Sequence, residues 1–171
     1  MTAPHRVPII RNAHGRATFA RGAVRVDRST RWASPFWIDQ PAIINQMTKR
    51  LVSDTRANRM KLVTELHFAW LMGLAQVHPA FWCLSPSTVD QLPDPPSLME
   101  VERELRGKVL ADWGEIGRPC IGDVLLAIAN RTADGKLFPT ASDNFKPEVA
   151  IRDPRRAHQG GAQLGYAAWG R

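Results

Sequence analysis

The sequence predicts an α/β fold: a single small domain with a short sheet and flanking helices over residues 1–130, then an irregular extension over residues 131–171. Over the first 130 residues two strands are followed by three helices, a third strand and a last helix, and strands interrupted by helices favour an α/β or α+β sheet with helices packed on it. The 171 residues, 44% of them hydrophobic, suffice for one ordinary core and are too few for two large domains. After residue 130 the periodicity ends and prolines and glycines become frequent, which is typical of irregular chain.

Two short strands are expected near the N-terminus. Residues 6–11 are largely apolar, and in residues 22–27 valines alternate with charged residues, the period of a half-buried strand. Residues 12–15 between them are expected to form a turn. The next stretch, 28–36, is expected to be a loop, because Pro35 restricts the preceding residue to extended geometry and no helical period runs through it.

Helices are expected wherever apolar residues recur at three- and four-residue spacing. Ser97 and Glu100 have the spacing of a capping box, in which each side chain accepts from the other residue's backbone N–H. Proline-rich residues 85–96 are expected to hold neither strand nor helix. The expected helices and the third strand are, in order, helices 42–52 and 55–76, a short helix from Ser97 to Gly107, strand 108–113 and helix 121–130.

Two loops follow strands of the predicted sheet. Residues 28–36 come after the second strand, and residues 114–120 come after the third. In open parallel sheets, ligands bind beyond the carboxyl ends of the strands. We therefore expect these two loops to converge on one site.

The formal net charge of +7 is confined to the ends of the chain. Residues 1–31 hold seven arginines and one acid, residues 152–171 hold four arginines and one acid, and the middle is slightly acidic. Arginine forks suit phosphate, so the pattern favours a nucleotide, RNA or DNA partner. A GC-rich genome that favours arginine codons, together with solvated arms, explains the charge equally well.

The composition also argues against several classes of protein. No run of about 18 apolar residues occurs, which argues against a membrane span, and the first ten residues lack the apolar stretch of a secretory signal. Cys83 and Cys120 are too few for a disulfide framework and fit a cytoplasmic protein. The five histidines are scattered without metal-ligand spacing, so no metal and no cofactor is expected, and the usual nucleotide-binding glycine motifs are absent.

The first candidate group lies in loop 28–36. Arg28 and Arg31 could hold a phosphate, with Ser29 and Ser34 as hydroxyl donors, and Trp32 could stack on a base. The alternative is that the aromatic residues of this loop belong to the core, because aromatic side chains bury a large area.

The second candidate group surrounds loop 114–120. Cys120 begins a predicted helix, where amide donors and the macrodipole favour a thiolate, and Asp123 lies one turn later. Asp123 or Asp112 could act as an acid or base, and Arg118 could bind an anion. Alternatively Cys120 is an inert buried residue and Asp123 caps the helix, since free cysteine is among the most buried residue types.

Four separated motifs resemble a family of small bacterial and phage domains of unknown function. Those domains carry a strand and loop like G-x-V-x-V-x-R and R-x-S-K-W-G-N-P-F, a W-L-x-G segment, an L-R-G-K-x-L-x-C-W-C strand, and P-C-H-x-D-V-L-x-x-x-A-N. The matching stretches, in the same order, are GAVRVDRSTRWASPF at 22–36, AWLMG at 69–73, ELRGKVLADW at 104–113 and PCIGDVLLAIAN at 119–130. The resemblance covers roughly residues 6–130 and implies the same fold.

The chain departs from that pattern at the Cys/His positions. Asp112 and Gly114 stand where the resembled domains have C-x-C, and Ile121 stands where they have His. Cys120 alone remains of that group, so a metal site of the resembled type is not expected here. A diverged or inactive member is one interpretation of these losses.

Together these observations predict a cytoplasmic protein, of phage or bacterial type, that binds a phosphorylated small molecule or nucleic acid between loops 28–36 and 114–120. If it is an enzyme, the expected chemistry is a transferase or glycosidase-like reaction on a nucleotide. The alternative is a non-catalytic assembly subunit of a phage or ribonucleoprotein complex that uses its basic ends, including residues 131–171, as arms ordered on a partner.

Overall fold

The computed structural model describes residues 4–49, 53–132 and 135–137. Within these ranges the chain forms a mixed α/β fold, as expected. Most of the predicted C-terminal extension, 131–171, lies outside the described residues. No helix in the described part of the chain is long and apolar enough to cross a membrane.

A three-stranded parallel sheet forms one layer of the molecule. Strand β5 (Leu110–Asp112) lies in its centre, between β1 (Arg6–Pro8) and β4 (Val24–Arg25). In the register, Leu110 stands opposite both Arg6 and Val24. The sheet therefore joins the two N-terminal strands through a strand whose residues lie 86 and 104 positions later in the chain than their partners in β4 and β1.

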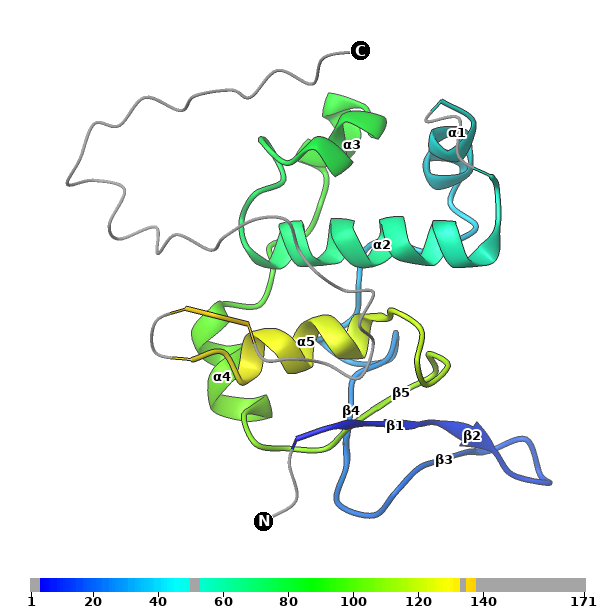
Figure 1. Cartoon of the computed structure of the whole chain (residues 1–171), viewed down its shortest axis with the longest axis vertical. Coiled ribbons are helices and arrows are strands. Elements are labelled where there is room, and N and C mark those ends of the chain that lie inside the picture. The colour runs from blue at the N-terminus through cyan, green and yellow to red at the C-terminus, as the bar shows by residue number, and fades with distance from the viewer. Residues whose placement is uncertain (1–3, 50–52, 133–134, 138–171) are drawn as a thin grey trace.

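A small antiparallel hairpin continues from β1. It consists of β2 (Ile10–Arg11) and β3 (Ala17–Thr18), joined by the turn that the sequence predicts after residue 11. Strand β3 was not expected, because two residues carry too little periodicity to stand out. Figure 1 shows this hairpin extending away from the helical layers, on the side toward which β1 runs.

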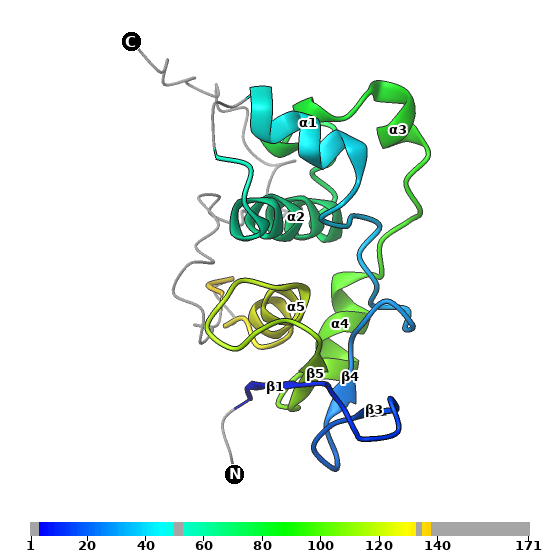
Figure 2. The same ribbon diagram turned by 90° about the vertical axis from the view of Figure 1, so that its right-hand side faces the viewer.

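The helices stack in layers on the sheet. Helices α4 (Leu98–Leu105) and α5 (Ile121–Ala129) lie closest to it, α2 (Arg56–Leu71) covers α5, and α1 (Pro41–Lys49) lies beyond α2 (Figures 1 and 2). A short 3-10 helix, η1 (Pro79–Cys83), packs against α1 and α2. The expected ends agree to within five residues, and the predicted capping box holds, because Ser97 and Glu100 cap α4. The Thr55 side chain caps α2.

The core lies between the sheet, α5 and α2. Its largest fully buried side chains include Phe36, Leu66, Leu110, Leu125 and Ile128. Phe36 meets the ring of Phe81 edge-on, with ring centroids 5.6 Å apart. The core therefore includes two aromatic residues of loop 28–36, Trp32 and Phe36, and these anchor the loop beside the sheet.

One expectation about the middle of the chain is wrong. Residues 85–96 were expected to hold no helix, but Pro86–Asp90 forms the short helix α3. Proline is tolerated there because it occupies the first helical position, where its missing N–H would have no partner in any case. The Ser85 hydroxyl caps this helix by accepting from the Thr88 N–H at 3.2 Å.

Candidate functional site

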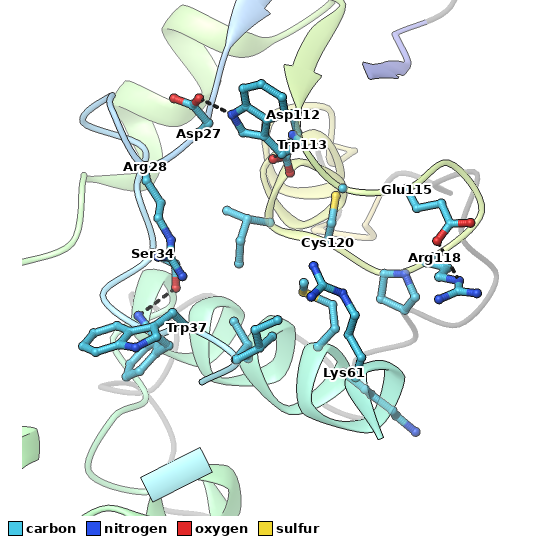
Figure 3. Close-up of a pocket in the computed structure, with 18 of the residues that line it drawn as sticks. Asp27, Arg28, Ser34, Trp37, Lys61, Asp112, Trp113, Glu115, Arg118 and Cys120 are labelled. Atoms are coloured by element: carbon cyan, nitrogen blue, oxygen red, sulfur yellow. Dashed lines mark hydrogen bonds and ion pairs between the residues drawn. The ribbon is translucent and has the colours of Figure 1, made fainter. Parts of the chain in front are cut away.

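The two loops that follow β4 and β5 line a single cavity of about 920 Å³. Loop 28–36 contributes one side of its lining and loop 114–120 another, while the first residues of α2 complete it. Figure 3 shows Arg28, Ser34 and Trp37 on one side of the hollow, Glu115 and Arg118 on the other, and Cys120 between them. The convergence arises because β4 and β5 are parallel neighbours whose carboxyl ends meet at one edge of the sheet.

Loop 114–120 is held in place by Arg6, at the start of β1. The guanidinium is buried and donates to the carboxylate of Asp123 at 3.1 Å. It also donates to the carbonyl oxygens of Gly114, of Glu115 at 2.8 Å and of Arg118 at 3.2 Å. One buried side chain thus provides the hydrogen-bond donors for three carbonyl oxygens of the loop. We call Arg6 and these four partners the clamp.

The start of α5 meets the end of β5 in a close contact. The Gly122 N–H donates to an oxygen of Asp112 at 2.9 Å, and the Cys120 N–H donates to Asp123 at 3.2 Å. A Cβ added to Gly114 would lie 2.5 Å from the Cβ of Cys120, so a side chain at position 114 would force the two segments apart.

The environment of Cys120 disfavours the thiolate. The residue is 3% exposed. Burial raises the pKa of its thiol well above the usual value, and the neighbouring carboxylates of Asp112 and Asp123 raise it further. Arg6 opposes this effect without overcoming it. The expected influence of the helix N-terminus is therefore outweighed, and Cys120 is a protonated thiol in the cavity lining.

Asp27, at the end of β4, organises the other side of the cavity. Its carboxylate accepts from the indole N–H of Trp113 at 2.7 Å, from Arg25 at 2.6 Å and from the Ser29 hydroxyl at 2.7 Å. Although burial opposes ionisation, these hydrogen bonds lower the pKa of Asp27 to about 2. Asp27 is therefore ionised at neutral pH and ties loop 28–36 to the residue after β5.

The cavity lining is rich in cations. Five basic residues and three acidic residues contribute to it, and the acidic ones are Asp27, Asp112 and Glu115. Arg118 pairs with Glu115 at 3.1 Å. Among the residues that the structure describes, no carboxylate pairs with the other four basic residues, which are Arg11, Arg28, Arg56 and Lys61.

Two helix N-termini and two tryptophans also face this space. The first residues of α2 (56–58) and the residues that begin α5 (120–121) are part of the lining, so their positive dipole ends add to the charge. Trp37 and Trp113 are each 42% exposed. The guanidinium of Arg28 lies 6.0 Å from the Trp37 ring, and that of Arg11 lies 5.2 Å from the Trp113 ring.

The structure brings some of the predicted site residues together and places others elsewhere. Those that line the cavity are Arg28, Ser34, Asp112, Arg118 and Cys120. Ser29 and Asp123 are engaged with Asp27 and Arg6, respectively. Arg31 pairs with Glu100 and Glu104 of α4 and lies 4.4 Å from the ring of Trp32, which is buried in the core.

A family model matches residues 10–131, which is more than half of the chain, and its description reads "Domain of unknown function (DUF4326)". The chain belongs to this family. No curated protein and no solved structure matches it. The match includes both cavity loops and the first residues of α2, but it begins after Arg6.

Sequence reasoning missed several residues that shape the cavity in this DUF4326 chain. Arg6 and Asp27 position the loops, Trp113 lines the cavity, and Arg56 and Lys61 supply cations from α2. One local signal was available: Asp27-Arg28-Ser29 is the kind of sequence in which an aspartate accepts from the backbone two residues on, as it does here at 3.0 Å. Among the described residues no cluster of three metal-ligating side chains occurs.

Proposed function

We propose that this chain binds a nucleotide, alone or within a nucleic acid, in the cavity between loops 28–36 and 114–120. The observation that carries the proposal is a set of four basic side chains that line the cavity and form no ion pair with a carboxylate of the described residues. They are Arg11, Arg28, Arg56 and Lys61. Clustered like charges repel one another, so such a set favours an anionic ligand that neutralises them.

The distribution of groups around the cavity suits the two halves of a nucleotide. Arg56 is the first residue of α2, where its guanidinium and the helix dipole together favour phosphate oxygens, and Lys61 adds an ammonium from the second turn. Trp37 and Trp113 offer partly exposed ring faces for a base. The volume of about 920 Å³ lies within the range of small-molecule sites.

The resemblance drawn from the sequence motifs supports the same location. Positions 112, 114, 120 and 121 are those at which the resembled domains carry Cys or His, and all four line this cavity. In the resembled domains, the Cys and His side chains at these positions would therefore line the equivalent cavity. In this chain Asp112 is the carboxylate of the predicted acid/base pair that lines the cavity, whereas Asp123 is paired with Arg6.

The second candidate function, a non-catalytic assembly subunit, is favoured by the chemistry of Cys120. Its thiol is held protonated by burial and two carboxylates, so the best nucleophile of the sequence does not serve as one at neutral pH. Under this proposal the cavity recognises a ligand without transforming it. Incubation of the protein with nucleotides, followed by product analysis, separates the two functions, with Asp112→Asn as the matched variant.

Thermal unfolding with and without nucleotides tests binding. Nucleoside mono-, di- and triphosphates are each added at increasing concentration, with inorganic phosphate as the comparison. At about 100 times the dissociation constant a ligand stabilises by roughly 2.7 kcal/mol, which raises Tm by about 5–10 °C for a chain of this size.

The variant Lys61→Gln removes a cavity cation, and Lys108→Gln removes an exposed cation just before β5, at the opposite end of the strand from the cavity. We expect Lys61→Gln to weaken nucleotide binding roughly tenfold, the value of one charge-assisted contact. Lys108→Gln should bind like the wild type. Equal losses in both variants, or no Tm shift with any nucleotide, would refute a site in this cavity.

A further inference from the structure

A second basic surface adjoins the cavity. It is the hairpin formed by β2, β3 and the flanking residues, 10–21, which we call the arm. The arm carries Arg11, Arg16 and Arg21 and no acidic residue, and the first acid of the whole chain is Asp27. In Figures 1 and 2 it extends from the end of β1, away from the helical layers.

The arginines of the arm are available to a ligand. All three are exposed. The described residues pair none of them with a carboxylate, and among the described residues the side chains of Arg16 and Arg21 have no hydrogen bond, ion pair or ring contact. The backbone of the turn is fixed without them, because the Asn12 side chain accepts from the N–H groups of His14 at 3.0 Å and Arg16 at 2.9 Å. The turn of the arm is thus formed without the side chains of Arg16 and Arg21.

Arg11 connects the arm to the cavity. It lines the cavity, its guanidinium lies 5.2 Å from the ring of Trp113, and it donates to the carbonyl oxygen of Gly15 in the turn of the arm at 2.9 Å. The row of cations that begins at Arg56 and Lys61 therefore continues through Arg11 onto the arm. A ligand that filled the cavity and extended past Arg11 would run onto the segment that carries Arg16 and Arg21.

Apolar faces accompany these charges. Ile10 and Phe19 of the arm are 58% and 38% exposed, and Trp113 stands half-exposed between the arm and the cavity. A basic track interleaved with exposed aromatic faces is the arrangement that binds single-stranded nucleic acid, in which phosphates follow the charges and unpaired bases stack on the rings. A duplex hides its bases and makes no use of such faces.

We propose that the arm and the cavity form one continuous site for a single-stranded nucleic acid, with a terminal nucleotide in the cavity and the next phosphates along Arg11, Arg16 and Arg21. This rests on the proposed function, since it extends the nucleotide of that site into a strand. DNA and RNA share the chemistry that the site recognises, and the test includes both.

Fluorescence anisotropy of the full-length chain with labelled ten-nucleotide single strands of DNA and of RNA tests the proposal, alongside a labelled mononucleotide and a duplex. The variants are the double substitution Arg16→Gln with Arg21→Gln, the cavity substitution Lys61→Gln, and the control Lys108→Gln. Each titration is repeated over a range of salt concentrations, because each phosphate that the protein no longer neutralises lowers the slope of log affinity against log salt by about 0.7 for a single strand.

We expect the double variant to lose several-fold in affinity for the ten-nucleotide strands, to lower the salt slope by about 1.4, and to bind the mononucleotide like the wild type. The wild type should bind a single strand more tightly than the duplex. Lys61→Gln should weaken both the mononucleotide and the strands, and Lys108→Gln neither.

Two results would overturn the proposal while leaving the proposed function standing: unchanged binding of the strands by the double variant, or tighter binding of the duplex, when Lys61→Gln still weakens the mononucleotide. Failure of the proposed function has another signature, because mononucleotide binding would then be absent or insensitive to Lys61→Gln. Strand binding that falls only in the double variant would place the interaction on the arm alone and would refute the continuous site.

Discussion

Two groups of basic side chains border the cavity and are used in opposite ways: the clamp around Arg6, and a second group that we call the cation wall. In the clamp, Arg6 is buried and every group it meets is a partner: one carboxylate and three backbone carbonyl oxygens. In the cation wall, which we define as Arg28, Arg56 and Lys61, the described residues supply no carboxylate and the side chains are exposed. Both arrangements border the same cavity.

The difference separates charges that build the site from charges that can serve a ligand. A buried guanidinium is stable only when its hydrogen-bond donors are satisfied, which makes the clamp a fixed part of the fold. Exposed cations keep their water until something displaces it, so they contribute little to folding and remain available. Substitutions on the two sides should therefore affect different measurements.

The largest effect is expected from Arg6→Met. Without the guanidinium, the buried carboxylate of Asp123 loses its counter-charge and the carbonyl oxygens of the loop lose their donors. Removing one partner of a buried pair costs about 3–5 kcal/mol of unfolding free energy, measurable by urea denaturation. Arg118→Gln is the control, because its exposed pair with Glu115 should be worth less than about 1 kcal/mol. Similar losses in the two variants would abolish the distinction between the clamp and the surface charges.

The next effect is expected from Asp27→Asn. The new amide nitrogen would face donors from Arg25 or Trp113, so the unfolding free energy should fall by about 1–3 kcal/mol at pH 7. The pKa of Asp27 in the folded chain, about 2, lies below its ordinary value, so the advantage of the wild type is complete above about pH 4. It should shrink as the pH falls toward 2. Urea denaturation of both proteins across this range measures it, and a difference that did not change with pH would show that the charge of Asp27 is unimportant.

Cys120 should be slow to react although it lines the cavity. In a Cys83→Ser background, alkylation at pH 8.5 should be at least about tenfold slower in the folded chain than in urea, because burial and two carboxylates disfavour the thiolate. The rate is followed by mass spectrometry. A rate in the folded chain equal to or above that in urea would show that Cys120 is a reactive thiol. Cys120 would then belong with the residues that can serve a ligand and not with those that build the site.

The smallest effect on stability is expected in the cation wall. Arg28→Gln, Arg56→Gln and Lys61→Gln should each change the unfolding free energy by no more than about 0.5 kcal/mol, since the described residues make no ion pair with them. Each should nevertheless weaken nucleotide binding. A variant that loses stability and binding together would show that its charge belongs to the fold.

The sequence contained enough to locate the cavity but not to explain its shape. Period-two alternation in residues 22–27 and the segment 108–113 indicated two strands, and the rule for the carboxyl ends of parallel strands then brought loops 28–36 and 114–120 together. Local signals also placed the helix starts, because capping depends on residues three positions apart, such as Ser97 and Glu100.

What could not be predicted depends on contacts between distant segments. Nothing near Arg6 in the sequence indicates that its partners lie in loop 114–120 and in α5. Similarly, the assignment of Arg31 to a ligand site was reasonable from its loop, yet α4 presents two glutamates to it. Whether an arginine is paired or available is decided by tertiary packing, and a single sequence does not display that.

The pairing of β1 with β5 has a consequence for how the molecule is made. Arg6 and Asp123 are 117 positions apart, and the first strand of the chain finds its neighbour only when residues 110–112 are present. Closing so long a loop costs entropy before any contact compensates for it, and such non-local pairing slows folding. During synthesis the first strand therefore lacks its partner until about two thirds of the 171 residues have been made, and the cavity loops take their places only after that.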